Sequence, residues 1–249
     1  MMKITPVVKQ LLIINIIFFI GSQLVPASEH FLALFFPENP EFRVWQPITH
    51  MFMHGGFAHI AFNMFALYSF GSTLEHFWGG KKFLFFYISC GLGAALINFA
   101  VNYYFYQDAM NVLISNGFNK TQILQLISQA KIDPRWNDLL SISQLQHLYD
   151  AYTGAVIGAS GAIYGLLVAF AFMFPNAELG IMFIPIPVKA KYFVPIYMLL
   201  FDGFFGIFGS SLMGIDSGIA HYAHIGGAFF GFMIMWYWKK NQFNNNRWN

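Results

Sequence analysis

Three apolar stretches of this chain carry polar residues whose types could perform hydrolytic chemistry. Ser160 lies in GASGAIYG, His224 lies in HYAHIGGAFFG, and His59 and Asn63 lie in HGGFAHIAFNMF. A serine hydroxyl becomes a nucleophile when a nearby base takes its proton, and histidine is the side chain that most often does so. The residue types therefore predict acyl transfer by a serine and a histidine, if the fold brings the two together.

The spacing of glycines favours a pairing of Ser160 with His224. Two G-x-x-x-G patterns are present, formed by Gly161 with Gly165 and by Gly227 with Gly231. Glycines at this interval let two helix backbones approach closely. We call each of these glycine pairs a glycine seam. His224 precedes Gly227 by three residues, so its side chain lies on the same helix face as the second seam. Packing of the two seams would place a nucleophile beside its base, without a third acidic member.

Composition indicates that these residues lie in a membrane. The chain has 249 residues, of which 57% are hydrophobic and only 10% are charged, whereas a soluble domain has about 25% charged residues. The formal net charge of +2 is too small to indicate a nucleic-acid partner. Cys90 is the only cysteine, so no internal disulfide can form. An all-α membrane protein surrounded by the lipid bilayer is therefore predicted.

Six segments are apolar and long enough to be expected as membrane-spanning helices. They are residues 7–24, 57–78, 83–104, 153–174, 192–208 and 219–238. The first is expected to be a retained span rather than a signal peptide, because no small-residue cleavage site follows it. Residues 29–50 contain prolines and charges and are expected to form a loop or an interfacial segment rather than a span. Residues 1–240 would be the core, followed by a polar, disordered tail at 241–249.

The distribution of lysine and arginine predicts the orientation of the spans. With the N-terminus in the cytoplasm, six spans return the C-terminus there, and nine basic residues face the cytoplasm against four outside. Ser160, His224, His59 and Asn63 then lie at similar depth in the outer halves of their helices. The expected location is the cell (inner) membrane, as a multi-pass protein whose active site opens to the extracytoplasmic side.

The longest outer loop is an insertion at about residues 106–152. Within it, TQILQLISQA and SISQLQHLYDAY place apolar residues at helical spacing. Both sequences predict amphipathic helices. These helices would lie either on the outer leaflet or on the tops of the spans, and they are most simply a packed cap without chemistry.

The motifs together resemble those of the rhomboid family of intramembrane serine proteases. The matching sequences are HGGFAHIAFN (His54, His59, Asn63), GASG (Gly158, Ser160, Gly161) followed by Tyr164, and AHIGGAFFG (His224, Gly227, Gly231), with Glu75 and Trp45 as further matches. The resemblance covers about residues 7–238. It implies a six-transmembrane-helix, rhomboid-like bundle whose N- and C-termini are both cytoplasmic.

The resemblance also implies roles for individual residues. Ser160 would be the nucleophile and His224 its general base, while His59 and Asn63, with the Ser160 backbone N–H, would stabilise the oxyanion. Supporting positions are implied for Gly158, Gly161, Tyr164, His54 and Glu75, with Tyr164 packing beside the catalytic histidine. Helix packing is implied for Gly165, Gly227 and Gly231.

Two further positions stay open at this point. Trp45 matches the first residue of a Trp-Arg pair in the first outer loop, but Gln46 replaces the arginine, which leaves the role of that loop in doubt. His221 lies one turn before His224 on the same helix face, where it either tunes the site or caps the helix.

The predicted function is that of a serine endopeptidase that cleaves membrane-spanning protein substrates with a Ser-His dyad and needs no cofactor or metal. One alternative is a catalytically inactive relative that binds membrane clients. A metal-dependent enzyme would use His50 and His54, but the glutamate of H-E-x-x-H is missing. A transporter is the third alternative, because Asp202 lies within the fifth predicted span and matches no catalytic position of the family. The sequence indicates neither the natural substrate nor the oligomeric state.

Overall fold

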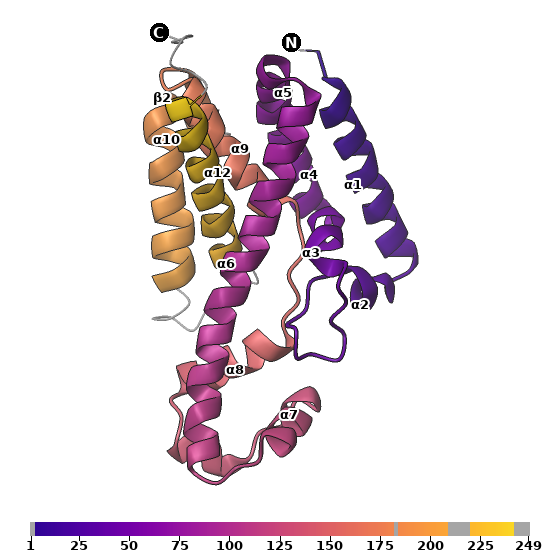
Figure 1. Ribbon diagram of the computed structural model, residues 1–249, viewed down its shortest axis with the longest axis vertical. Helices are drawn as coiled ribbons and strands as arrows, with labels where there is room; N and C mark the ends of the chain where they lie inside the picture. The colour runs from indigo at the N-terminus through magenta and orange to yellow at the C-terminus, as the bar shows by residue number, and fades with distance from the viewer. Residues whose placement is uncertain (1–2, 182–183, 209–219, 242–249) are drawn as a thin grey trace.

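Helices make up most of the computed structural model, which describes residues 3–181, 184–208 and 220–241 (Figure 1). The chain starts with α1 (Pro6–Leu24) and continues through the short helices α2 (Ser28–Leu32), α3 (Gln46–Thr49) and η1 (His50–Phe52). Next come α4 (Phe57–Ala66), η2 (Leu67–Gly71) and α5 (Ser72–Trp78). These three elements follow one another without a break, and η2 is a π-helical turn between two α-helical parts.

The second half of the chain is built around one long helix. This helix is α6 (Gly80–Ser115), and α7 (Lys120–Ser128), η3 (Pro134–Asp138) and α8 (Ile142–Thr153) follow it. The remaining elements are α9 (Ser160–Met173), the antiparallel pair β1 (Glu178–Ile181) and β2 (Ile184–Lys189), α10 (Ala190–Tyr197), the π-helical η4 (Met198–Phe208) and α12 (His221–Asn241). Because α10 and η4 are contiguous, they form a second unbroken helical run.

The main core lies where α6, α9 and α12 pack side by side (Figure 1). Small residues permit this packing, since a Cβ on Gly165 would lie 2.4 Å from Cys90 Sγ and one on Gly93 would overlap the Phe230 ring. Large side chains of α6, among them Phe83, Phe86 and Tyr87, are fully buried in the same cluster. The bundle is therefore close-packed between glycine-lined helices, which is how membrane helices gain contact area.

Glu75 joins the start of α1 to the end of α5. Its carboxylate accepts hydrogen bonds from the backbone N–H groups of Val7 (3.0 Å) and Val8 (2.8 Å) and from the Thr5 hydroxyl. The first N–H groups of a helix have no acceptor within it and favour a negative charge. Glu75 thus replaces an N-cap side chain for α1, and this interaction lies at the end of the bundle where α12 also finishes (Figure 1).

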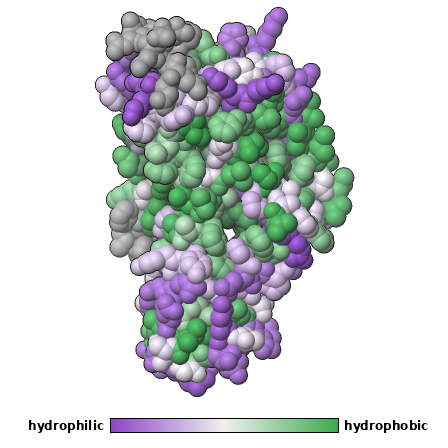
Figure 2. Space-filling view, viewed as in Figure 1, coloured by the Kyte–Doolittle hydropathy of each residue, from purple (hydrophilic) through white to green (hydrophobic). Residues whose placement is uncertain are grey.

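Apolar side chains cover the middle of the molecule, while polar ones gather at its two ends (Figure 2). Leu199, Phe65 and Ile17 are 70%, 66% and 61% exposed. A soluble monomer rarely exposes an apolar surface of this kind. By length and composition, α1 and α6 are long and apolar enough to cross a membrane.

The boundaries of two predicted spans are wrong. Helix α6 does not end near residue 104 but continues to Ser115, so the first ten residues of the predicted insertion belong to it. Tyr106, Met110 and Leu113 explain the extension, because they recur at helical spacing and are buried against the cap. Helix α9 begins at Ser160 rather than near residue 153, and residues 154–159 run up to it as a non-helical segment.

The two amphipathic helices predicted in the insertion are confirmed as α7 and α8. Their apolar faces, which include Ile123, Ile127 and Leu148, bury Trp136 and the far part of α6 in a second core (Figure 1). The hairpin β1–β2 was not predicted from the sequence. Apart from Asn241, the predicted polar tail lies outside the described residues.

Candidate active site

The structure brings Ser160 and His224 into direct contact. Ser160 is the first residue of α9, and His224 lies in the first turn of α12. His224 Nε2 lies 2.8 Å from Ser160 Oγ, which is a hydrogen-bond distance. The two residues are 64 positions apart in the chain, so their meeting depends on how the two helices pack.

The two glycine seams create this meeting. A Cβ added to Gly227 of α12 would lie 1.8 Å from the carbonyl oxygen of Gly161 in α9, and one added to Gly231 would lie 2.7 Å from Gly165 Cα. Backbone therefore touches backbone at both positions. Since Gly161 adjoins Ser160 and Gly227 follows His224 by three residues, the seam sets the distance between the two polar side chains.

Tyr164 covers one face of the His224 ring. It lies one turn after Ser160 on α9, and its ring stacks on the imidazole with centroids 4.2 Å apart and planes 13° apart. Stacking of this kind restricts rotation of the imidazole. Tyr164 thus occupies the position beside His224 that the resemblance implies.

The segment that leads into Ser160 is held by the first long loop. Leu34 and Val156 exchange backbone hydrogen bonds of 3.0 and 2.9 Å, and the Gly158 N–H donates to the His50 carbonyl at 2.9 Å. Gly158 has φ +122°, a conformation that L side chains rarely adopt, and a Cβ there would lie 2.8 Å from His59 Nε2. Glycine is therefore required at this position, two residues before Ser160 and the start of α9.

The run α4–η2–α5 contributes further polar groups near the start of α9. His59 of α4 approaches Gly158, and its ring lies 5.0 Å from that of His54, edge to face. Asn63, one turn further along α4, is buried, and its Nδ2 donates no hydrogen bond within the described part of the chain. A buried amide donor without an acceptor is costly, so this N–H group is available to a ligand.

One residue of the cluster was missed by sequence reasoning. Asp202 of η4 is 2% exposed, and its Oδ1 lies 2.7 Å from His224 Nδ1 and 2.8 Å from His221 Nδ1. The expectation that His224 has no acidic neighbour is therefore wrong. The signal was present, because an acid within MLLFDGFFG is a candidate functional residue in a membrane as well as a candidate structural one, but nothing in the sequence named its partner.

The two histidines of the predicted metal alternative, His50 and His54, belong to no group of three or more ligands in the part of the chain that the structure describes. His50 lies in η1 and its Nδ1 contacts the Gln46 carbonyl oxygen at 2.9 Å, whereas His54 follows the end of that helix. Among the described residues, the group that could hold a metal ion is Asp202, His221 and His224, whose ligand atoms lie within 4.8 Å of one another. The distances from Asp202 Oδ1 to the two imidazoles are those of hydrogen bonds.

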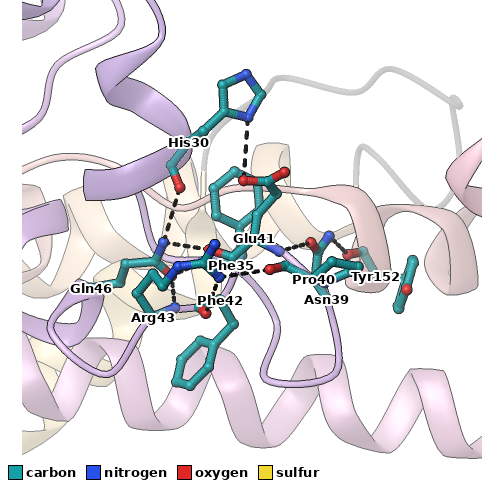
Figure 3. Close-up of polar contacts among 9 residues, drawn as sticks. All are labelled: His30, Phe35, Asn39, Pro40, Glu41, Phe42, Arg43, Gln46 and Tyr152. Carbon is teal, nitrogen blue, oxygen red and sulfur yellow. Dashed lines mark hydrogen bonds and ion pairs between the residues drawn. The ribbon is translucent and has the colours of Figure 1, made fainter.

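Gln46, which replaces the family arginine, organises the first loop (Figure 3). The side chain is fully buried. Its Oε1 accepts from the backbone N–H groups of Phe35 (3.3 Å) and Arg43 (3.0 Å), and its Nε2 donates to the carbonyls of His30 (3.3 Å) and Glu41 (2.8 Å). All four hydrogen bonds that this amide can make are therefore formed. The substitution thus leaves a loop that is cross-linked by one neutral side chain.

Glu75 lies away from this cluster, at the opposite end of α9. Phe77, two residues after Glu75, packs against Phe174 just beyond the last residue of α9, with ring centroids 5.2 Å apart, whereas Ser160 begins that helix. The hydrogen bonds of Glu75 go to α1. Glu75 is therefore separated from Ser160 by the length of α9.

Comparison with known proteins identifies the family of this chain. The family model described as "Rhomboid domain" matches residues 41–119 and 139–241. An uncharacterized mitochondrial rhomboid protein of Schizosaccharomyces pombe is 27% identical over 223 residues, covering 80% of this chain and 53% of that protein. Rhomboid protease AarA of Providencia stuartii is 29% identical over 201 residues, covering 76% of this chain and 54% of that protein.

A third relative matches a shorter stretch. Rhomboid protease GluP of Bacillus subtilis is 35% identical over 60 residues, covering 24% of this chain and 12% of that protein. The chain spans about half the length of the two relatives that it matches over most of its own length. The family model, by contrast, covers well over half of this chain and includes the helices that carry Ser160 and His224, so the chain belongs to the rhomboid family.

Proposed function

We propose that the protein is an intramembrane serine endopeptidase with Ser160 as nucleophile and His224 as general base. The observation that carries this proposal is the 2.8 Å contact between His224 Nε2 and Ser160 Oγ at the first residue of α9. A hydroxyl so placed loses its proton to the imidazole as Oγ attacks a carbonyl carbon. The imidazolium then gives that proton to the leaving amine, and water hydrolyses the acyl-enzyme by the reverse sequence.

The oxyanion of this reaction would form at the N-terminus of α9. The first backbone N–H groups of a helix have no acceptor within it, and the helix dipole is positive at that end. The imidazole of His59 approaches Gly158, and the buried Nδ2 donor of Asn63 lies one turn further along α4. Donors held in place before the reaction stabilise the charge that develops in the transition state.

The proposed topology is a bundle of six spans. Besides α1, α6, α9 and α12, the contiguous runs α4–η2–α5 and α10–η4 would each cross the bilayer. Members of the rhomboid family are integral membrane proteins. Lys3 and Lys9 lie around the start of α1, and Lys239 and Lys240 lie at the end of α12. Both ends would face the cytoplasm, in accordance with the positive-inside rule. The site around Ser160 would then open to the extracytoplasmic side of the inner membrane.

The proposed substrates are membrane-spanning segments of other proteins. AarA and GluP are named as rhomboid proteases, and a serine site within an apolar bundle can meet a peptide bond only where the substrate also enters the bilayer. A helix hides its peptide groups in internal hydrogen bonds. Substrates that unwind easily, through glycine or proline, would therefore be cleaved fastest.

A reconstituted cleavage assay tests this function. The full chain is placed in liposomes with a single-span reporter protein, and serine reactivity is followed with a fluorophosphonate probe. We expect cleavage and labelling by the wild type, loss of both in Ser160→Ala and His224→Ala, and no loss in Ser115→Ala, which removes an exposed hydroxyl of the cap. A folded wild type that neither cleaves reporters nor reacts with the probe would instead favour the inactive, client-binding alternative.

A further inference from the structure

We propose that Asp202 is a positioning residue of this site, so that the protein works with a Ser-His-Asp triad rather than a dyad. The proposal rests on the proposed function, because it assigns a role to Asp202 in the reaction of Ser160. It starts from a chain of two contacts in which each ring nitrogen of His224 has one partner. Nδ1 lies 2.7 Å from Asp202 Oδ1, and Nε2 lies 2.8 Å from Ser160 Oγ.

This chain of contacts determines where the imidazole carries its proton. An ionised carboxylate can only accept hydrogen bonds, and a neutral imidazole has one donor and one acceptor nitrogen. Asp202 therefore holds the proton on Nδ1, which leaves the lone pair of Nε2 directed at Ser160 Oγ. Without the carboxylate, the other tautomer would place a proton on Nε2, and that imidazole could not act as a base.

Asp202 also acts during proton transfer. When Nε2 takes the serine proton, His224 becomes a cation whose side chain is only 12% exposed. A carboxylate 2.7 Å away stabilises that charge without itself accepting the proton. The proton then passes from Nε2 to the leaving amine as the C–N bond breaks, so His224 returns to the neutral form and Asp202 stays ionised throughout.

The surroundings of Asp202 favour a role at the site over a purely structural one. The carboxylate is 2% exposed, and a buried charge needs partners. The hydrogen-bond partners of its Oδ1 are His224 and His221, both of which belong to the cluster around Ser160. His221 donates to the same Oδ1 at 2.8 Å, and one carboxylate oxygen can accept two hydrogen bonds. His221 therefore holds the carboxylate, which in turn holds His224.

The experiment compares variants of the full chain in liposomes. We expect Asp202→Asn to lower kcat about 10²–10⁴-fold, with KM changed by less than about threefold, because the substitution favours the wrong tautomer and leaves substrate binding intact. Asp202→Glu keeps the acceptor and should recover part of the rate. His221→Gln leaves the contact with His224 in place and should lower kcat less than about tenfold. Asp133→Asn, in the outer cap, makes the same chemical change away from the site and should match the wild type.

A spectroscopic readout separates positioning from mere stability. In detergent micelles, the His224 Nδ1–H that faces a carboxylate should give a low-field proton resonance. This resonance should persist in Ser160→Ala and disappear in Asp202→Asn. It is measured on protein whose thermal unfolding shows that it is folded, and if Asp202→Asn does not fold, the wild type, Ser160→Ala and Asp202→Glu still report it.

Three results would overturn the triad. They are an Asp202→Asn variant with the kcat of the wild type, a folded wild type without the low-field resonance, and cleavage that a chelator abolishes and Zn²⁺ restores, since a metal would then occupy the same three side chains. The proposed function fails separately, if the wild type neither cleaves nor reacts with a fluorophosphonate probe. In that case the resonance alone still shows whether Asp202 holds His224.

Discussion

Gly227→Ala should inactivate the protein without touching any polar group of the site. The added Cβ would lie 1.8 Å from the Gly161 carbonyl oxygen and 2.6 Å from its carbon. Carbon and oxygen atoms that are not bonded stay about 3.3 Å apart or more. Neither partner can yield by rotating a side chain, because both are backbone. Helices α9 and α12 must therefore separate by about 1.5 Å at this point.

A separation of this size is enough to break the contact between the proposed nucleophile and its base. Ser160 adjoins Gly161, so the 2.8 Å distance to His224 Nε2 would lengthen to about 4 Å, beyond the range of a hydrogen bond. A misplacement of about 1 Å costs about 10²-fold in rate. We expect kcat to fall at least about 10²-fold, and overpacking to reduce stability by about 1–3 kcal/mol.

The assay is cleavage of a single-span reporter in liposomes, with thermal unfolding measured in parallel. Gly21→Ala is the matched control, because an added Cβ at this position of α1 meets nothing within 4 Å. That variant should keep full activity and gain up to about 1 kcal/mol from helix propensity. If Gly227→Ala cleaves as fast as Gly21→Ala, the seam does not set the geometry of Ser160 and the reasoning is refuted.

Three further outcomes follow from the site and the loops. Asn63→Ala should lower kcat about 10²–10³-fold with little effect on unfolding temperature, since it removes one proposed oxyanion donor; an unchanged kcat would exclude that role. Gln46→Leu should destabilise the protein by about 2–4 kcal/mol, because it leaves buried backbone groups of the first loop without partners, and limited proteolysis of that loop measures the effect. Burial would raise the pKa of Glu38, but the Lys120 ammonium and the Tyr106 hydroxyl hold it below its usual value. The ionised carboxylate therefore stabilises the folded protein at neutral pH, and this contribution is lost as the pH falls below about 4.5 through the folded pKa. The unfolding temperatures of wild type and Glu38→Gln should differ at pH 7 and converge in acid, and a constant difference would contradict the assignment.

The sequence was sufficient to place Ser160 beside His224 because both lie next to glycine seams. A G-x-x-x-G pattern states where a helix can touch another backbone, and a side chain one turn away is then brought to the contact. The amphipathic helices of the cap were predictable for a related reason. The apolar residues of α7 and α8 recur at helical spacing, so each helix has one face to bury.

Asp202 could not be assigned from the sequence because no local pattern fixes the direction of its side chain. It lies in η4, a π-helical run, where side chains do not follow the spacing of an α-helix. The spacing of acid and histidine across 22 residues carries no geometric information. Similarly, the non-helical segment before α9 depends on backbone contacts with Leu34 and His50, which are formed by residues far away in the chain.

Ser160 is therefore fixed from three directions that are independent in the sequence. The glycine seam sets its distance from α12, the first loop holds the segment that precedes it, and Asp202 of η4 contacts the histidine that it faces. Buried polar groups inside an apolar bundle have no water to satisfy them, so each must find a partner in the protein or leave one free for a ligand. The oxygen and nitrogen atoms of Asp202 and His224 that form the chain to Ser160 have found theirs, whereas the Nδ2 donor of Asn63 has not. The proposed function predicts this contrast, because the proposed base already has its partners and the proposed oxyanion donor would pair only with a substrate carbonyl.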